Sequence, residues 1–421
     1  MLTVRSGTAR LNIPSILEAV GESITNFVTE TASQNHSTVA LEDLSGNINS
    51  LSLSRWTSRL SKLRSLTLWD GGALNESVAI SIANNCFDFD DLTFKNFGDD
   101  KDPGLASFFS GLRPNTLRSF TALSANGVGP QTLLALNHHS SSLKVLKLDG
   151  LDSTGIRSLN LLQGCTSLEV LDLVAERTAA LIDLKATEND VFLEVVSWLR
   201  KCEQLRDLSI GSLTTSPSIL TEVCLCNNIK LRKLAVSGYL IADNQDFHRS
   251  LSHQTTLEHL DLKADPEGGF RDDIDILIYS VSKLSKLKSL NLLNDTSIDF
   301  RTHDIQSLTA PLKNLEELTF SGWDVNDSIW RSLSGLWHLR ALNILAVSSF
   351  TLDGVLAFVS TLKDTNNGLN LVVMNQMPTH SLSAAEQDII RESIDAKVNG
   401  SFDYVLWKDP EDDSESESAS D

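Results

Sequence analysis

Several kinds of residue and segment are scarce in this 421-residue chain, and each scarcity excludes a class of protein. Its five cysteines are an odd number without framework spacing, which favours a reducing compartment over a disulfide-rich secreted domain. No stretch approaches the roughly 18 consecutive apolar residues that a membrane-spanning helix needs. The first ten residues lead into no apolar run, so we expect no secretory signal peptide. We therefore expect a cytoplasmic or nuclear protein that does not bind a membrane.

Positive charge is also scarce, because 35 Lys and Arg face 55 Asp and Glu, for a net charge of -20. Binding to phosphate backbones needs clustered Lys and Arg, so this balance argues against nucleic acid as a partner. Residues 411–421 hold six acids and no base and should form a disordered tail. Within it, Ser414 and Ser418 each precede an acid by three residues and are possible phosphorylation sites, although a plain solubilising tail explains them equally.

The motifs of common catalytic sites are missing as well. Gly127-Val-Gly129-Pro130 lacks the third glycine and the lysine of a phosphate-binding loop. There is no Gly-x-Ser-x-Gly elbow, and the nine histidines include no His-Glu-x-x-His pair. His259 lies near Asp261 and Lys263 in the sequence, but no nucleophile accompanies it. We therefore expect no enzyme, no catalytic residue, no metal site and no cofactor.

A six-residue pattern, Leu-x-x-Leu-x-Leu, recurs eleven times in phase along most of the chain. Its leading residues are separated by 24 to 37 positions and are Leu63, Phe89, Leu117, Leu143, Leu168, Leu205, Leu231, Leu257, Leu287, Leu315 and Leu339. Such a period is typical of a leucine-rich repeat solenoid. We predict an α/β fold, a curved horseshoe with a parallel β-sheet on the concave side and helices on the convex side.

The expected organisation is one continuous solenoid with capping segments at both ends. Residues 1–62 should hold an amphipathic cap helix over 11–30 and an irregular first strand over 39–53, too close to the first repeat for another helix. The repeats should span 63–382, with residues 174–190 forming an insertion loop that is either a binding element or a harmless excursion. A C-terminal cap over 383–410 should open on the capping box Ser383-Ala-Ala-Glu386, continue as a helix to about Val398 with Gly400 in the terminating position, and add a closing strand.

The repeat phase also assigns side chains to faces of the sheet. The second and third apolar residues of each repeat should point into the core, and alternate residues should point to the concave side. This face carries the candidate partner-binding residues Trp69, Asp91, Lys95, Lys147, Asp149, Asp172, Asp207, Lys233, His259, Asp261, Lys263, Asn291, Glu317 and Asn343. Its mixed polarity suits a protein or peptide partner, with Trp69 either an anchor for that partner or packed beneath the N-terminal cap.

The position after each leading residue carries a charge of alternating sign in most neighbouring repeats, for example Lys144, Glu169 and Arg206. Adjacent parallel strands lie about 4.8 Å apart, so we interpret this as a structural charge ladder and not as a nucleic-acid-binding stripe.

Cys86, Cys165 and Cys202 each lie three residues before a leading residue, where other repeats have Leu. We expect these thiols to be small buried hydrophobic groups.

The fragments Cys86-x-x-Phe-x-x-Leu-x-Phe, Cys165-x-x-Leu-x-x-Leu-x-Leu and Cys202-x-x-Leu-x-x-Leu-x-Ile resemble the repeats of F-box leucine-rich-repeat proteins. The ending Phe402-Asp-Tyr-Val-Leu-Trp-Lys-Asp-Pro410, followed by an acidic serine tail, is similar to that of fungal members. The resemblance implies a ribonuclease-inhibitor-like fold and a substrate-recognition subunit for ubiquitin ligation.

The sequence departs from that family at two points. No F-box is visible before the repeats, so a ubiquitin-ligase adaptor is an expected partner only if that module lies upstream. The usual Asn after the last Leu is replaced by apolar residues, which should pack inward, at Phe97, Leu151, Leu213, Tyr239, Trp323 and Val347. The alternatives are a GTPase-activating horseshoe of the same superfamily, or a generic scaffold with no link to ubiquitin.

Overall fold

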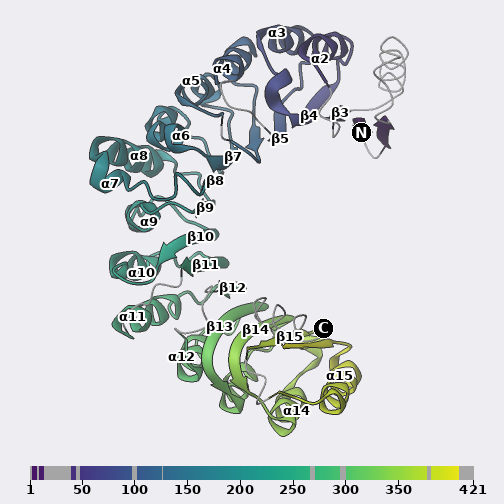
Figure 1. Cartoon of the computed structure of the whole chain (residues 1–421), viewed down its shortest axis with the longest axis vertical. Coiled ribbons are helices and arrows are strands. Elements are labelled where there is room, and N and C mark those ends of the chain that lie inside the picture. Colours follow the sequence, from purple (N-terminus) through teal and green to yellow (C-terminus); the bar gives the residue numbers. More distant parts are fainter. Residues whose placement is uncertain are drawn as a thin grey trace, which may run out of the picture. The chain divides into compact units, whose positions relative to one another are not determined.

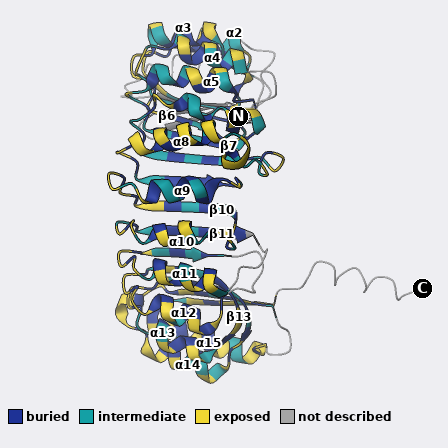
Figure 2. Cartoon of the chain, turned by 90° about the vertical axis from the view of Figure 1, so that its left-hand side faces the viewer, coloured by how far each residue is buried: buried dark blue, intermediate teal, exposed yellow. Residues whose placement is uncertain are grey.

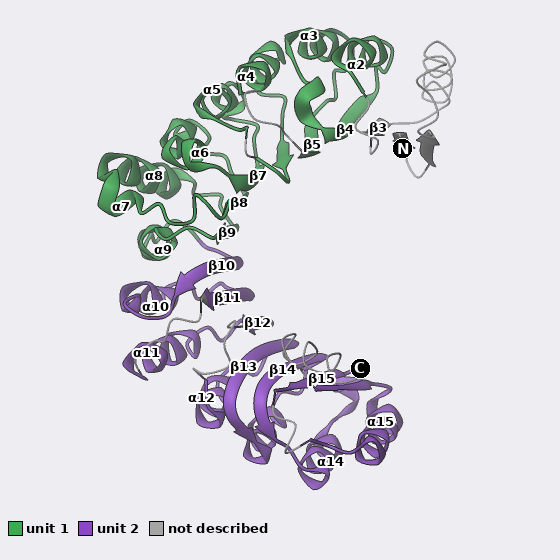
Figure 3. Cartoon of the chain, in the orientation of Figure 1, with its two compact units in different colours: residues 1–229 green, residues 230–421 purple. Residues whose placement is uncertain are grey.

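The computed structural model describes residues 2–6, 9–13, 39–43, 48–96, 102–125, 127–265, 271–293, 300–376 and 381–406. The chain divides into two compact units, Met1–Ile229 and Lys230–Asp421 (Figure 3). The domain boundaries that the sequence pattern predicted at residues 62, 382 and 410 stay a prediction. Repeats pack only on their neighbours, so an array of them has no single core that holds all parts together.

The first unit alternates strands with helices. Its elements are β1 Leu2–Ser6, β2 Ala9–Ile13, β3 Val39–Asp43, α2 Ser50–Thr57, β4 Leu63–Asp70, η2 Gly71–Ala73, α3 Glu76–Asn85, β5 Asp91–Asn96, α4 Asp102–Gly111, β6 Ser119–Ala122, α5 Pro130–Ala135, η3 Leu136–His139, β7 Val145–Leu151, α6 Ser153–Arg157, η4 Leu159–Leu162, β8 Val170–Ala175, α7 Leu184–Thr187, α8 Asn189–Lys201, β9 Asp207–Gly211 and α9 Ser216–Cys224. Strands β3 to β9 pair in sequence order and in parallel, whereas β1 is antiparallel to β2 and β3.

The second unit repeats the same alternation. Its elements are β10 Lys233–Leu240, α10 Gln245–Leu251, β11 His259–Asp265, α11 Arg271–Val281, β12 Ser289–Leu292, α12 Thr302–Thr309, β13 Glu317–Asn326, η5 Asp327–Ile329, α13 Trp330–Leu333, β14 Ala341–Ser349, α14 Leu352–Thr361, η6 Asp364–Asn366, β15 Asn370–Asn375, α15 Ala384–Val398 and β16 Ser401–Leu406. Strands β10 to β16 also pair in order and in parallel. In each unit the strands form one layer and the helices the opposite one (Figure 1).

The repeat phase predicted this arrangement, and the register confirms it. In the first unit Leu146 pairs with Leu171, which pairs with Leu208, and in the second Leu234 pairs with Leu260. These leucines are at most 2% exposed. Buried positions alternate with exposed ones along the strands in both units (Figure 2). The fold is therefore an α/β leucine-rich repeat solenoid.

The N-terminal expectations were partly wrong. A helix was predicted from residue 11, but residues 9–13 form β2, and the remainder of 11–30 lies outside the described residues. The irregular strand predicted over 39–53 is in fact a strand at Val39–Asp43 followed by helix α2 at Ser50–Thr57. Asn49 caps that helix by accepting a hydrogen bond from the Ser52 N–H at 2.8 Å.

The insertion at 174–190 folds against its own unit. It contains the short helix α7, and Ala179 and Leu184 are fully buried in it. The Leu184 N–H donates to the Thr215 hydroxyl at 2.8 Å. Leu181, although apolar, is 86% exposed. The segment is therefore a packed element and not an open loop.

The C-terminal cap follows its sequence signals with one correction. Ser383 and Glu386 form the predicted capping box, and β16 closes the second unit beside β15. Helix α15 ends at Val398 as predicted, but the residue that ends it in the left-handed conformation is Asn399, with a φ of 49°, and not Gly400. Glycine is needed at position 400 for a different reason, because a Cβ there would lie 2.3 Å from the Leu369 carbonyl oxygen. Trp407 and the tail with Ser414 and Ser418 lie outside the described residues.

The structure describes most of the residues that the sequence assigned to the core, namely the three repeat cysteines and the apolar residues that replace the usual Asn. Cys86, Cys165 and Cys202 are buried, and burial raises the pKa of each thiol to about 12, as expected of packing residues. Leu151, Leu213 and Tyr239 pack inward as predicted, Val347 is only half-buried and Phe97 lies outside the described residues. Trp323 is 46% exposed, because a register shift in β13 between Gly322 and Val325 turns Val325 inward instead.

Candidate functional site

The candidate site is the sheet face, defined as the side chains that alternate with the buried leucines along β4–β9 in the first unit and β10–β15 in the second. All fourteen predicted residues lie on these strands and none of them is buried. In β7, for example, Lys147 lies between the buried Leu146 and Leu148. The structure therefore places each residue where the repeat phase predicted, while partner binding by them stays a prediction.

An apolar group with a cation marks the N-terminal end of the sheet face. Trp69 on β4 and Leu123, which follows β6, are 44% and 46% exposed. Lys95 lies between them on β5, with its Nζ 5.6 Å from the centre of the Trp69 ring. Beside them, the Ser65 hydroxyl donates to Asp91 Oδ2 at 2.8 Å. An exposed aromatic ring flanked by a cation is a typical anchor in protein interfaces.

Carboxylates gather farther along the same face. Lys147 and Asp172 occupy register-paired positions on β7 and β8, and Asp207 follows on β9. The pKa of Asp149 is raised, first by burial and then by the nearby charge of Asp172. The Oδ1 atom of Asp172 is shielded from solvent and has no hydrogen-bond partner among the described residues. This stretch therefore carries an excess of hydrogen-bond acceptors.

A shallow hollow of about 350 Å³ lies where the sheet face meets the predicted charge ladder. The Arg64 guanidinium forms two-pronged hydrogen bonds with Asp90, and Arg118 lines the same hollow. Lys144 pairs with Glu169 in the same row. These contacts between neighbouring repeats support the structural interpretation of the ladder.

The second unit carries a more polar sheet face. Burial raises the pKa of Asp261, against the opposing effects of the Lys263 charge, 3.9 Å away, and a hydrogen bond with Asn291. Ser289 donates to Glu317 at 2.9 Å, and the Asn343 amide donates to Thr319 at 3.1 Å. Lys233 is exposed and His259 is half-buried on the first two strands. Side chains of adjacent strands therefore tie one another in place, which makes this face preorganised for a partner.

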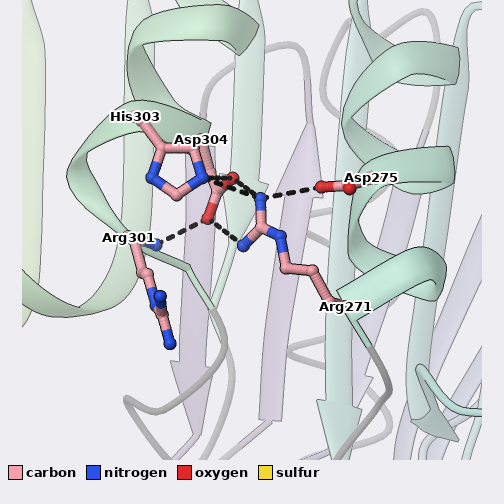
Figure 4. Close-up of polar contacts among 5 residues, drawn as sticks. All are labelled: Arg271, Asp275, Arg301, His303 and Asp304. Carbon is pink, nitrogen blue, oxygen red and sulfur yellow. Dashed lines mark hydrogen bonds and ion pairs between the residues drawn. The ribbon is translucent and has the colours of Figure 1, made fainter.

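The sequence did not predict a cluster of charged side chains at the starts of α11 and α12. Figure 4 shows Arg271, at the start of α11, reaching Asp304 at the start of α12. Arg271 Nη1 donates to Asp304 Oδ2 at 2.8 Å, and the Arg301 N–H donates to the same oxygen at 2.8 Å. His303 lies 3.1 Å from Asp304 Oδ1, and Asp275 lies 2.7 Å from Arg271.

The electrostatics of this cluster favour an ionised carboxylate. Asp304 is only 2% exposed, and burial raises its pKa, but the hydrogen bonds from Arg271 and Arg301 outweigh burial and leave the pKa lowered. No sequence motif joins residues 271 and 304, although Asp three residues after Arg301 is a typical helix-start position. The cluster ties two neighbouring helices together, and within the described part of the chain none of its hydrogen bonds or ion pairs involves a Ser, Thr or Cys nucleophile.

Two further findings bear on chemistry. Within the described ranges, no group of three or more His, Cys, Asp or Glu side chains is arranged to hold a metal ion. None of the helices in that part of the chain is both long and apolar enough to span a bilayer. His259 is flanked by Asp261 and Lys263 on the exposed face of β11, as the alternation predicted.

Comparisons with known proteins add little to this account. No family model and no curated sequence matches the chain. Among solved structures, an internalin (inlF) from Listeria monocytogenes is similar with a TM-score of 0.46 and 15% identity, covering 81% of this chain and 94% of that one. The Rad7 and Elc1 complex in yeast gives a TM-score of 0.41, 12% identity and coverage of 87% and 86%.

The leucine-rich repeat-containing protein LegL7 from Legionella pneumophila gives a TM-score of 0.36, 14% identity and coverage of 83% and 96%. Scores at this level do not decide function. The assignment to a leucine-rich repeat fold rests on the strand register and burial described above.

Proposed function

We propose that this chain is a non-enzymatic scaffold that binds another protein through the sheet face. The observation that carries the proposal is the row of outward side chains that successive parallel strands present in each unit. Exposed apolar side chains such as Trp69, Leu123 and Met374 alternate there with charged ones. Protein interfaces combine apolar anchors and polar surroundings in this way.

A photo-activatable amino acid placed on the sheet face tests this proposal. We would substitute it at Lys147 on β7, and at Leu193 on α8 as a matched exposed position on the helix layer. After irradiation in an extract of the source cells, we expect a discrete cross-linked protein only from position 147. The same product from position 193, or none from position 147, would contradict the assignment of the face.

We further propose that the captured partner is a substrate for ubiquitin ligation. Support comes from the cysteine-containing repeats around Cys86, Cys165 and Cys202, which resemble those of F-box leucine-rich-repeat proteins. Stable co-purification of a ubiquitin-ligase adaptor with the protein expressed from its complete gene would support this role. Its absence would leave a generic scaffold, and faster GTP hydrolysis by a small GTPase would favour the activating alternative instead.

A further inference from the structure

Basic side chains gather at one edge of the second unit, although the whole chain is strongly acidic. We define the basic edge as the turns that lead from α11 to β12, α12 to β13, α13 to β14 and α14 to β15. These turns carry six bases against Glu316 and Asp364, and the bases are Lys283, Lys286, Lys288, Lys313, Arg340 and Lys363. All six are exposed.

The opposite edge, where strands lead into helices, is acidic. Asp272, Asp304, Asp327 and Asp353 lie at or next to helix starts there. Anions are favoured at helix N-termini, which accounts for these carboxylates, although Arg271 and Arg301 lie beside them. The six bases lie in the turns beyond the helices and not in the last helical turns of α11, α12 and α14, so it is the repetition of these turns that gathers them at one edge.

Exposed aromatic rings accompany the bases. Tyr279 and Trp337 are 63% and 53% exposed. Lys283 Nζ lies 4.4 Å from the centre of the Tyr279 ring, and Lys363 Nζ lies 3.7 Å from that of Trp337. Such cation-covered rings supply apolar contact area for a ligand that also carries negative charge.

Several of these cations are available for binding. Lys288 forms an ion pair with Glu258, at 3.0 Å. Lys286, Lys313 and Arg340 form no ion pair within the described part of the chain. The turns succeed one another at the spacing of neighbouring strands, about 4.8 Å, while an extended peptide presents side chains on one side about every 6.6 Å. An extended acidic segment lying along the edge could therefore reach several of them.

We propose that the basic edge binds an extended, acidic segment of a partner protein. This surface is separate from the sheet face and goes beyond the proposed scaffold function. A protein segment fits better than nucleic acid, because a phosphate backbone needs clustered Lys and Arg, whereas Glu316 and Asp364 interrupt the row of bases. The aromatic rings favour the apolar side chains that a protein segment can carry beside its acids.

Fluorescence anisotropy of the full chain with a labelled deca-glutamate peptide tests the proposal. We expect saturable binding at about 50 mM salt that weakens at about 200 mM. The variant Lys286→Gln/Lys313→Gln should weaken binding about tenfold, equivalent to ~1.4 kcal/mol. The control Lys233→Gln/Lys263→Gln removes the same charge from exposed sheet-face positions of the same unit and should change affinity less than about twofold.

A matched pair of tryptophans tests the aromatic contribution. For this test the labelled peptide alternates Glu with Leu, so that it carries apolar side chains for the rings to contact. Trp337→Ala should weaken its binding several-fold, whereas Trp323→Ala, 46% exposed and away from the basic edge, should not. Circular dichroism verifies that all variants fold. Equal effects of test and control variants, no binding at low salt, or tighter binding of a ten-nucleotide single strand than of deca-glutamate would overturn the proposal.

Discussion

Two histidines are enclosed in the core, one in each unit. His139 Nδ1 accepts a hydrogen bond from the Leu117 N–H, so its Nε2 donates to the Phe109 carbonyl at 3.2 Å. His248 is fully buried, and neither of its ring nitrogens has a partner among the described residues. Burial lowers the pKa of each to about 4, so both rings are neutral in the folded protein.

Stability should therefore fall in mildly acidic solution. The unfolded chain binds protons on these rings near pH 6.5, whereas the folded chain does so only near pH 4. The stabilisation is fully present above pH 6.5 and is lost as pH falls toward 4, by about 1.4 kcal/mol per unit for each ring. His248→Leu should reduce this slope in urea unfolding while changing stability at pH 7.5 by less than about 1.5 kcal/mol. An unchanged slope would show that His248 titrates normally in the folded state.

The Asp304 carboxylate should contribute strongly to the second unit. Asp304→Asn removes the charge that Arg271 faces inside the protein, and we expect a loss of about 3 kcal/mol in urea unfolding. Asp246→Asn is the control, since Asp246 is 89% exposed in its pair with Arg249 and should cost less than about 1 kcal/mol. Equal losses in both variants would contradict a structural role for the cluster.

Single positions were predictable wherever the repeat period applied. The period places Lys147 outward and Leu146 inward without any knowledge of neighbours. It contains no information about His248, Arg271 or Asp304, whose environments depend on which helices meet. It also does not reveal that Asn366 and Gln254 hydrogen-bond backbone groups of Leu336 and Leu231, in the turns that precede β14 and β10.

At the scale of elements, boundaries followed local chemistry. Helix α3 covers Glu76–Asn85, and Asn75 caps it by accepting a hydrogen bond from the Val78 N–H at 3.1 Å. Helix α2 was missed because Ile48, Leu51 and Leu53 imitate the strand spacing. The expected strand position Ile48 lies only 15 residues before Leu63, which is too close for a helix between two strands. The real strand lies earlier, at Val39–Asp43, and this leaves enough residues for helix α2.

Two glycines in the same fold should respond oppositely to alanine. Gly400→Ala would place a Cβ 2.3 Å from the Leu369 carbonyl oxygen and should destabilise the C-terminal cap by more than about 2 kcal/mol. Gly104→Ala, within α4, meets nothing closer than 3.8 Å and should stabilise its helix by up to about 1 kcal/mol. Thermal unfolding measures both, and a neutral Gly400→Ala would show that α15 and β15 are packed less closely than described.

At the scale of the whole molecule, the main consequence of the fold is that successive repeats within each unit have the same orientation. In-phase leucines make the core, outward residues make the sheet face, and in the second unit the turns that follow the helices make a basic edge. The first two follow directly from the sequence period. The third was not predicted, because the net charge of -20 conceals a local excess of bases.

A disulfide between neighbouring strands tests the common phase most directly. Register-paired Lys147 and Asp172 should have Cα atoms about 5 Å apart, within the range for a disulfide, whereas Ser209 lies one strand farther, at about 10 Å. With the half-buried Cys226 replaced by Ser, oxidised Lys147→Cys/Asp172→Cys should form the bond, detected by mass spectrometry of peptides, and Lys147→Cys/Ser209→Cys should not. No bond in the first variant, or an equal yield in the second, would contradict the leucine-rich repeat register.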